Sequence, residues 1–236
     1  MKISIIIPVY NEKKDIRKVI EEVKKIKLNK EIIIVDDYSK DGTRQILKKY
    51  NSFRSNKRDG AKNDKIKVLF HKKNCGKGRA IRTGLKEASG EIVAIQDADL
   101  ELDPSDHKRI IKKMQTSGAD VVYGSRFLGK VEGMHWLNRL ANQFLTGLLN
   151  LLYGGDLTDI NTAYKTFKRS VIEKLKLRCE RFEFDPEVTL KVIKTGYKIT
   201  EIPINYRART KEQGKKICWR DGFESLWTII KYRFTD

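Results

Sequence analysis

Short apolar segments of strand type alternate with segments of helical periodicity through the first half of this chain. The strand-type segments are Lys2–Pro8, Glu31–Val35, Ile66–Phe70, Ile92–Gln96 and Ala119–Tyr123. Between them, apolar residues recur at the spacing of an amphipathic helix, as in residues 16–26. Near-continuous apolar strands joined by helical crossovers favour a mainly parallel sheet with helices on both faces. The sequence therefore predicts an α/β fold.

The second half of the chain is less regular, but two long apolar stripes stand out in it. Leu137–Leu152 and Trp219–Phe234 both have the periodicity of an amphipathic helix, and the second predicts a C-terminal amphipathic helix. A polar segment, Asn51–Asp64, predicts a surface loop. No linker or internal repeat is visible, so we expect a single domain over residues 1–236.

The chain carries a large excess of positive charge. Its 236 residues include 50 Lys and Arg against 31 Asp and Glu, which is a formal net charge of +19. A basic surface favours polyanionic partners such as nucleic acid, anionic lipid or phosphorylated substrates. No zinc-finger, ribonucleoprotein or helix-turn-helix signature is present, so the positive charge is the only feature that favours nucleic acid. Because charge is a generic indication, we expect no nucleic-acid partner.

Targeting and redox features are few. The chain passes from Met1-Lys2 directly into a strand, without a signal-peptide pattern, and no apolar stretch reaches the ~18 residues of a transmembrane helix. Three cysteines and three histidines have no metal-ligand spacing, so we interpret His71, His107 and His135 as surface or packing residues. These features predict a cytoplasmic protein, peripheral on the cytoplasmic face of a membrane.

The fourth apolar segment ends in two aspartates, Asp97 and Asp99. In extended backbone, residues i and i+2 point to the same side. Two carboxylates that converge at a strand end suit a hard divalent cation such as Mg²⁺ or Mn²⁺. Such a cation, held open on one side, can clamp a pyrophosphate. An acidic turn without a metal is the alternative interpretation, since Asp is common in turns.

Polar motifs also follow the second and third strand segments. Asp36-Asp37 ends the second strand, and Asn74-Cys75-Gly76-Lys77-Gly78 opens the third helix. A carboxylate at Asp37 can accept hydrogen bonds from a nucleobase, and glycines at a helix N-terminus let backbone N–H groups meet an anion. Ligands of parallel sheets bind outside the carboxyl ends of the strands. We therefore expect these motifs and Asp97–Asp99 to form one site.

Three motifs together resemble those of the family 2 glycosyltransferases of the GT-A type. They are Pro8-Val9-Tyr10-Asn11-Glu12, Asp36-Asp37-Tyr38-Ser39-Lys40-Asp41-Gly42-Thr43 and Asp97-Ala98-Asp99, in the family's order and at similar separations. Asn74–Gly78 is similar to the family's Asn-x-Gly-Lys-Gly. The resemblance implies a GT-A fold in which residues 1–125 bind a nucleotide-diphosphate sugar and residues 126–236 bind the acceptor.

Within the family, the chain is most similar to dolichol-phosphate mannose synthases and other polyprenyl-phosphate glycosyltransferases. Gly124-Ser125-Arg126-Phe127 resembles their Gly-Ser-Arg segment, and Arg139 falls where they have a second acceptor-side arginine. Arg209 and Lys216 resemble a basic pair that closes over the phosphates. Glu101 stands where mannose synthases usually have Gln.

The resemblance implies a role for each matching residue. Asp97, Asp99 and Glu101 would hold the Mg²⁺ or Mn²⁺ ion. The residues expected to bind substrates are Pro8, Tyr10, Glu12, Asp37, Lys77, Asp97, Arg209 and Lys216. The residues expected to be catalytic are Asp99, Arg126 and Arg139.

The nature of the acceptor decides which chemistry is needed. A lipid phosphate is already ionised near neutral pH and needs cations rather than a strong base. We therefore expect an inverting transfer of a hexose from a GDP-mannose or UDP-glucose type donor to a polyprenyl or dolichyl phosphate. A hydroxyl acceptor, such as a glycan, would instead need a carboxylate base, with Asp185 or Glu187 as candidates.

The two apolar stripes also bear on a membrane role. Core packing explains each stripe singly, but Trp and Tyr flanked by Lys and Arg suit a bilayer interface. We expect at least one of the two helices to contact a membrane surface. A membrane-anchoring subunit is a further candidate partner.

Overall fold

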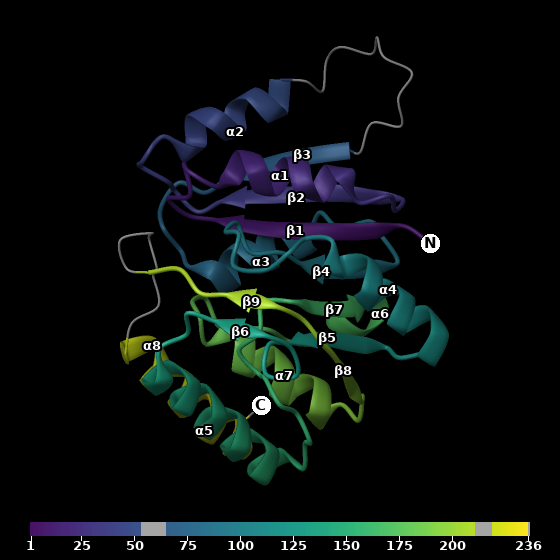
Figure 1. The fold of residues 1–236 in the computed structure, drawn as a ribbon, viewed down its shortest axis with the longest axis vertical. Helices are drawn as coiled ribbons and strands as arrows, with labels where there is room; N and C mark the ends of the chain where they lie inside the picture. Colours follow the sequence, from purple (N-terminus) through teal and green to yellow (C-terminus); the bar gives the residue numbers. More distant parts are fainter. Residues whose placement is uncertain (53–64, 211–218, 236) are drawn as a thin grey trace.

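A central sheet with strand order β3-β2-β1-β4-β7-β5-β8 runs through the molecule in the computed structural model, which describes residues 1–52, 65–210 and 219–235 (Figure 1). Its strands are β1 Ile3–Val9, β2 Lys30–Asp36, β3 Lys65–Phe70, β4 Ile92–Ile95, β5 Val121–Ser125, β7 Lys165–Lys168 and β8 Ile199–Pro203. A separate pair is formed by β6 Val131–Glu132 and β9 Tyr206–Arg207. The sheet therefore joins the two halves of the chain.

The strand directions confirm the prediction of a mainly parallel sheet. β1 pairs in parallel with β2 and β4, β2 with β3, and β5 with β8. The exception is β7, which is antiparallel to both of its neighbours, β4 and β5. The carboxyl ends of β1, β2 and β4 therefore meet at one edge of the sheet, where the sequence motifs lie.

Helices cover both faces of the sheet, and the strand residues alternate between the two cores. Ile5 and Ile7 of β1 belong to one core, whereas Ile6 belongs to the other. The first core includes residues of α1 (Ile16–Lys25), α2 (Thr43–Ser52) and α4 (Asp106–Ser117). The second includes residues of α3 (Lys77–Leu85), α6 (Arg169–Ile172) and α7 (Phe184–Lys194). The predicted surface loop Asn51–Asp64 lies outside the described residues, apart from its first two, which end α2.

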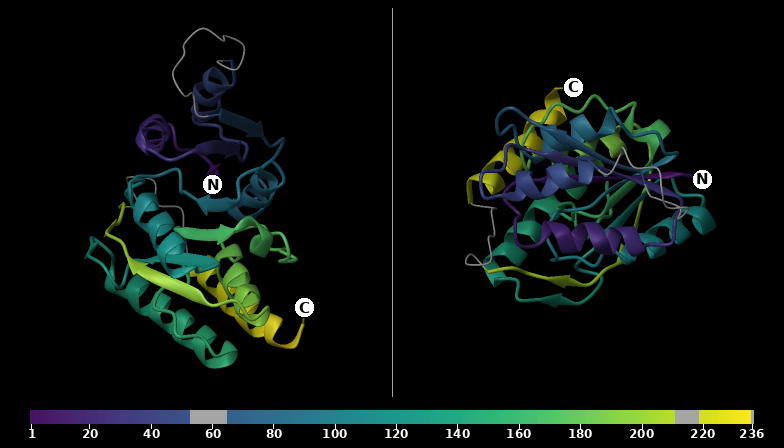
Figure 2. Two further views of the ribbon diagram at one scale, coloured as in Figure 1. Left: turned by 90° about the vertical axis from the view of Figure 1, so that its right-hand side faces the viewer. Right: turned by 90° about the horizontal axis from the view of Figure 1, so that it is seen from above.

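The helices α5 (Trp136–Tyr153) and α8 (Trp219–Phe234) pack side by side at one end of the molecule (Figures 1 and 2). Their inner faces form a third core around Leu149 and Ile229, and the Tyr153 hydroxyl donates to the Ile229 carbonyl at 2.7 Å. Their outer faces expose large apolar side chains: Trp136, Leu137, Leu140, Phe144, Leu151, Trp219, Phe223, Trp227, Ile230 and Phe234. Among the described residues, no helix has the length and apolar character needed to span a membrane.

Candidate active site

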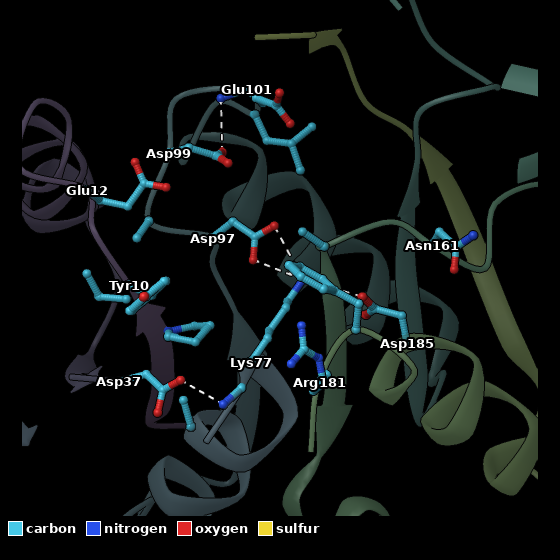
Figure 3. A pocket seen from close by; sticks show the side chains of 18 of the residues that line it. Tyr10, Glu12, Asp37, Lys77, Asp97, Asp99, Glu101, Asn161, Arg181 and Asp185 are labelled. Atoms are coloured by element: carbon cyan, nitrogen blue, oxygen red, sulfur yellow. Dashed lines mark hydrogen bonds and ion pairs between the residues drawn. The ribbon is translucent and has the colours of Figure 1, made fainter. Parts of the chain in front are cut away.

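A cavity of about 420 Å³ opens at the carboxyl ends of β1, β2 and β4 (Figure 3). Its wall contains residues of the strand-end motifs and also residues of the second half of the chain. The predicted site residues that line it are Pro8, Tyr10, Glu12, Asp37, Lys77, Asp97, Asp99, Glu101, Arg126 and Arg209. The structure therefore brings most of the predicted residues together in one place.

Arg209 lies among acidic side chains at one end of this cavity. Its guanidinium donates to both carboxylate oxygens of Glu12, at 2.9 and 3.1 Å, and to Asp99 at 2.9 Å. Glu101 accepts a hydrogen bond from the Arg209 backbone N–H at 2.7 Å. Burial raises the pKa of Asp99 to about 7, and the Asp97 and Glu101 carboxylates add to this effect while Arg209 opposes it. Arg209 thus offsets part of the negative charge of this acidic group.

Lys77 joins Asp97 to Asp185 in the middle of the cavity. Its Nζ lies 3.1 Å from Asp97 Oδ1 and 3.4 Å from Asp185 Oδ2. Although burial disfavours the charged amine, the Asp185 and Asp97 carboxylates raise the pKa of Lys77. Figure 3 shows this lysine between the two carboxylates. A fixed positive charge therefore lies beside Asp97, at the N-terminus of α3.

Asp37 is held rigidly at the base of the cavity wall. The backbone N–H groups of Cys75 and Gly76 donate to its two oxygens at 2.8 and 2.7 Å, and His71 Nδ1 lies 2.7 Å from Oδ1. Gly76 has φ of +96°, and a side chain there would collide with the Glu180 carbonyl oxygen. The glycine of the Asn-x-Gly-Lys-Gly segment is therefore required by close packing.

Several motif residues hold the site loops together and do not line the cavity. Ser39 Oγ accepts from the Asn11 N–H at 2.9 Å, and Asn11 Oδ1 accepts from the Lys40 N–H at 2.8 Å. The Thr43 hydroxyl accepts from the Glu12 N–H at 2.9 Å. These bonds tie the loop after β1 to the loop after β2. They explain why two motifs distant in the sequence contain short polar side chains.

Arg126 enters the cavity wall from the second half of the chain. Its Nε and Nη2 donate to the two oxygens of the buried Asp159 at 2.7 and 2.8 Å. Burial disfavours its charge, but Asp159 raises the pKa of Arg126 above its usual range. The guanidinium carbon also lies 5.1 Å from the centre of the Tyr206 ring. Arg126 is therefore charged and fixed in orientation.

One predicted acceptor-side residue, Arg139, is not found in this wall. Arg139 is exposed on α5, with its guanidinium carbon 5.9 Å from the Phe127 ring, and is not among the described residues that line the cavity. Lys216 lies outside the described residues. The guanidinium carbon of Arg126 lies 5.7 Å from the centre of the same Phe127 ring, so this phenylalanine is near both a cavity residue and a residue of α5.

The two candidate bases differ in position. Glu187 is buried away from the cavity, where it accepts from Lys191 Nζ and from the backbone N–H groups of Arg178 and Cys179. Its proposed role as a base is not supported by this geometry. Asp185 does line the cavity, but it pairs with Lys165 Nζ at 2.9 Å as well as with Lys77. Burial favours its neutral form, yet these two lysines lower the pKa of Asp185.

Some cavity residues lie in segments that the motifs did not mark. Arg181 lines the cavity with 60% of its side chain exposed, and its Nε lies 3.9 Å from Glu224 Oε2 of α8. The Tyr206 hydroxyl donates to Glu101 Oε2 at 3.0 Å, and Asn161 completes this side. Asn161 and Arg181 lie outside helices and strands, and Tyr206 begins the two-residue strand β9, so periodicity carries no signal for any of them.

The acids of the cavity fit a hard divalent cation in their chemistry, because all offer carboxylate oxygens, and burial together with the nearby Asp97 and Glu101 carboxylates raises the pKa of Asp99. Their placement differs from the prediction. β4 ends at Ile95, so Asp97 and Asp99 lie in the loop that follows the strand. Asp97 contacts Lys77, whereas Asp99 contacts Arg209. A cation held by Asp97, Asp99 and Glu101 would compete with these ion pairs.

A second group of ligand atoms was missed by the sequence argument. One ligand atom each from Asp37, His71 and Cys75 lies within 4.8 Å of the others. The interpretation of His71 as only a surface or packing residue is therefore incomplete. His71 and Cys75 lie four residues apart in the loop between β3 and α3, but Asp37 follows β2, so spacing along the chain could not reveal the complete group.

Comparison with known protein families agrees with the class of enzyme that the fold and the cavity indicate. Residues 4–176 match the family model described as Glycosyl transferase family 2. The chain belongs to glycosyltransferase family 2. It is 29% identical over 222 residues to a dolichol-phosphate mannosyltransferase of Pyrococcus furiosus. This alignment covers 91% of the present chain and 59% of that protein. It is also 29% identical over 238 residues to an uncharacterized protein of Methanocaldococcus jannaschii, with 97% and 91% covered.

Solved structures support the GT-A fold. Glucosyl-3-phosphoglycerate synthase from Mycobacterium tuberculosis, in complex with Mn²⁺, UDP and phosphoglyceric acid, superposes with a TM-score of 0.71 at 17% identity, covering 100% of this chain and 79% of that one. TarS of S. aureus, in complex with UDP-GlcNAc, gives a TM-score of 0.62 at 20% identity, with 97% and 65% covered. The predicted fold class is confirmed.

Proposed function

We propose that this protein is an inverting, metal-dependent glycosyltransferase that moves a hexose from a nucleotide-diphosphate sugar to a polyprenyl phosphate. The observation that carries the proposal is the composition of one cavity. It combines an acidic group and Lys77 from the first half with Arg126, Arg181 and Arg209 from the second. The similarity to a dolichol-phosphate mannosyltransferase supports the same assignment.

The donor side of the cavity suits a nucleotide diphosphate. A divalent cation bound by Asp97, Asp99 and Glu101 would neutralise the charge that builds on the leaving pyrophosphate. Lys77 adds a fixed cation beside Asp97. Asp37 lines the same cavity, and its carboxylate retains capacity to accept hydrogen bonds from a nucleobase.

The acceptor side suits an anion better than a hydroxyl. The carboxylate of Asp185 is a weak base because two lysines lower its pKa, and Glu187 is buried elsewhere. A phosphate acceptor needs no such base, since it is already ionised. Its oxygens would be positioned by the guanidinium of Arg126 and by the half-exposed Arg181. In-line attack opposite the leaving group inverts the anomeric carbon.

The test is a transfer assay with a matrix of substrates. Donors are GDP-mannose and UDP-glucose, each with Mg²⁺ or Mn²⁺, and acceptors are a short polyprenyl phosphate, phosphoglyceric acid and an oligosaccharide. We expect a lipid-linked sugar, detected by mass spectrometry, with one donor. Transfer only to phosphoglyceric acid or to the oligosaccharide would contradict the lipid acceptor, and loss of activity should follow Asp99→Asn.

We propose further that the outer face of α5 and α8 docks on an anionic bilayer, on the cytoplasmic side. This face exposes three tryptophans, with 64–70% of each residue accessible. Exposed basic residues of the same helices, namely Arg139, Arg220, Lys231 and Arg233, suit anionic headgroups. Phe127 connects this face to the cavity through Arg126 and Arg139, so a docked membrane would present the lipid acceptor near the site.

Vesicle sedimentation tests the docking surface. Wild-type protein should bind vesicles that contain phosphatidylglycerol, and a Trp227→Ser, Phe223→Ser variant should bind at least tenfold more weakly with unchanged thermal stability, because both side chains are exposed. Leu128→Ser, which changes an exposed apolar residue outside α5 and α8, is the matched control. Equal binding by all three proteins would refute the assignment.

A further inference from the structure

Three side chains of different chemistry converge behind the donor side of the cavity. Asp37 follows β2, His71 follows β3, and Cys75 precedes α3. One ligand atom of each lies within 4.8 Å of the other two. Among the described residues, these three side chains form the group of His, Cys and acidic residues that is close enough to hold a metal ion. We propose that this cluster is a binding site for a Zn²⁺-class transition metal, and that an ion bound there excludes the nucleotide donor.

The carboxylate of the cluster is already oriented. Asp37 is 3% exposed, and its Oδ1 lies 2.7 Å from His71 Nδ1. Backbone N–H groups of Cys75 and Gly76 donate to its two oxygens at 2.8 and 2.7 Å. Hydrogen bonds to a ligating carboxylate of this kind hold its orientation and are typical of metal sites. The ligand therefore loses little freedom when an ion binds.

The imidazole is held from its other side. His71 Nε2 lies 3.0 Å from the Thr83 hydroxyl of α3, which can either donate or accept. Histidines that bind metal through one nitrogen usually donate the other N–H to such a partner. On binding, the ion takes Nδ1 of the neutral ring, the single ring proton resides on Nε2 and is donated in a hydrogen bond to Thr83 Oγ1, and the Cys75 thiol releases its proton to solvent. Charge and protons balance with one proton released.

The donor set selects a different metal from the acidic group in the cavity. One nitrogen, one sulfur and one oxygen are the ligands that Zn²⁺ and Co²⁺ prefer, whereas Mg²⁺ and Mn²⁺ prefer oxygen alone. Cys75 is half-buried and reachable from solvent. Three protein ligands leave a fourth position for water. The site therefore takes a Zn²⁺-class ion even when Mg²⁺ is abundant.

The consequence for the donor rests on the function proposed above. Asp37, Asn74 and Gly76 all line the cavity, and Asn74 Nδ2 donates to the Asp37 carbonyl at 3.3 Å. The carboxylate assigned to the nucleobase would be the carboxylate that binds the ion. Metal and nucleotide therefore compete for Asp37, and trace Zn²⁺ would inhibit the enzyme in the presence of its activating cation.

Cobalt spectroscopy on the 236-residue chain tests the site without any enzyme assay. With Mg²⁺ in excess, added Co²⁺ should give a thiolate-to-cobalt charge-transfer band that saturates at one equivalent. The band should vanish in Cys75→Ser and persist in Cys179→Ser. Cys179 is a matched control because it is also half-buried, while burial raises the pKa of its thiol to about 12. Thr83→Val should weaken Co²⁺ binding by about tenfold or more.

The outcomes separate the two parts of the proposal. Absence of the band, or its persistence in Cys75→Ser, overturns the metal site. For the competition, UDP and GDP binding is measured by calorimetry with and without Zn²⁺, and Zn²⁺ should weaken it at least tenfold in wild type but not in Cys75→Ser. A cobalt band with unchanged nucleotide binding overturns the inhibition alone. A cobalt band without binding of either nucleotide overturns the proposed function and the inhibition, while the metal site stands.

Discussion

Replacement of Arg209 by glutamine tests the electrostatic organisation of the cavity. The Arg209 side chain is 14% exposed, its guanidinium donates to Glu12 and Asp99, and the Arg209 backbone N–H donates to Glu101. Glutamine removes the charge and leaves the acids without this counterion. Removing one partner of a buried ion pair costs about 3–5 kcal/mol, and partial exposure of the network places the expected loss near the lower end, about 3 kcal/mol.

The loss should depend on pH in a defined direction. The pKa of Asp99 is about 7 in the folded protein, above its value in the unfolded chain, and Arg209 is the group that lowers it. Between these two values the folded state holds a proton that the unfolded state has released, so stability falls as pH rises. Without Arg209 this effect strengthens. The deficit of Arg209→Gln should therefore be largest at about pH 8 and smaller at about pH 5.5.

Urea and thermal unfolding at both pH values measure this deficit. A loss of about 3 kcal/mol corresponds to a decrease in Tm of roughly 6–12 °C for a chain of this size. Arg207→Gln is the matched control, since Arg207 is 85% exposed and lies 3.9 Å from Glu132, and it should change stability by less than about 0.5 kcal/mol. Mg²⁺ should stabilise Arg209→Gln more than wild type. Equal effects of the two substitutions, or a deficit independent of pH, would refute the reasoning.

Two further predictions concern the neighbouring groups. Asp159→Asn removes the charge partner of the buried Arg126 and should lower the free energy of unfolding in urea by about 3 kcal/mol. The control Glu132→Gln, at an exposed ion pair, should lower it by less than about 0.5 kcal/mol. Similar losses in the two variants would argue against a buried pair. Mn²⁺ affinity, measured by electron paramagnetic resonance, should weaken about tenfold per unit below about pH 7, because protons compete for Asp99, and Asp99→Asn should show a flat profile.

The strand-end motifs predicted which residues of the first half would meet at one edge of the sheet. Buried apolar runs identify parallel strands, and parallel strands place their carboxyl ends at one edge, so Asp37 and Asp97 had to lie near each other. The orientation of Asp97 and Asp99 could not be predicted in the same way. The strand ends at Ile95, and the loop that follows turns the two carboxylates toward different cations.

The residues alone determined the α/β class, the edge of the sheet that binds ligand and the identity of most acids and cations there, because these depend on local periodicity and on strand direction. Tertiary structure alone decided which charges neutralise one another, as in Arg209 with Glu12, and that His71 approaches Cys75 and Asp37. It also decided that α5 and α8 turn tryptophans outward. Arg209 and Glu12, like His71 and Asp37, are far apart in the chain, and side-chain packing across the sheet selects among partners that the sequence leaves equivalent.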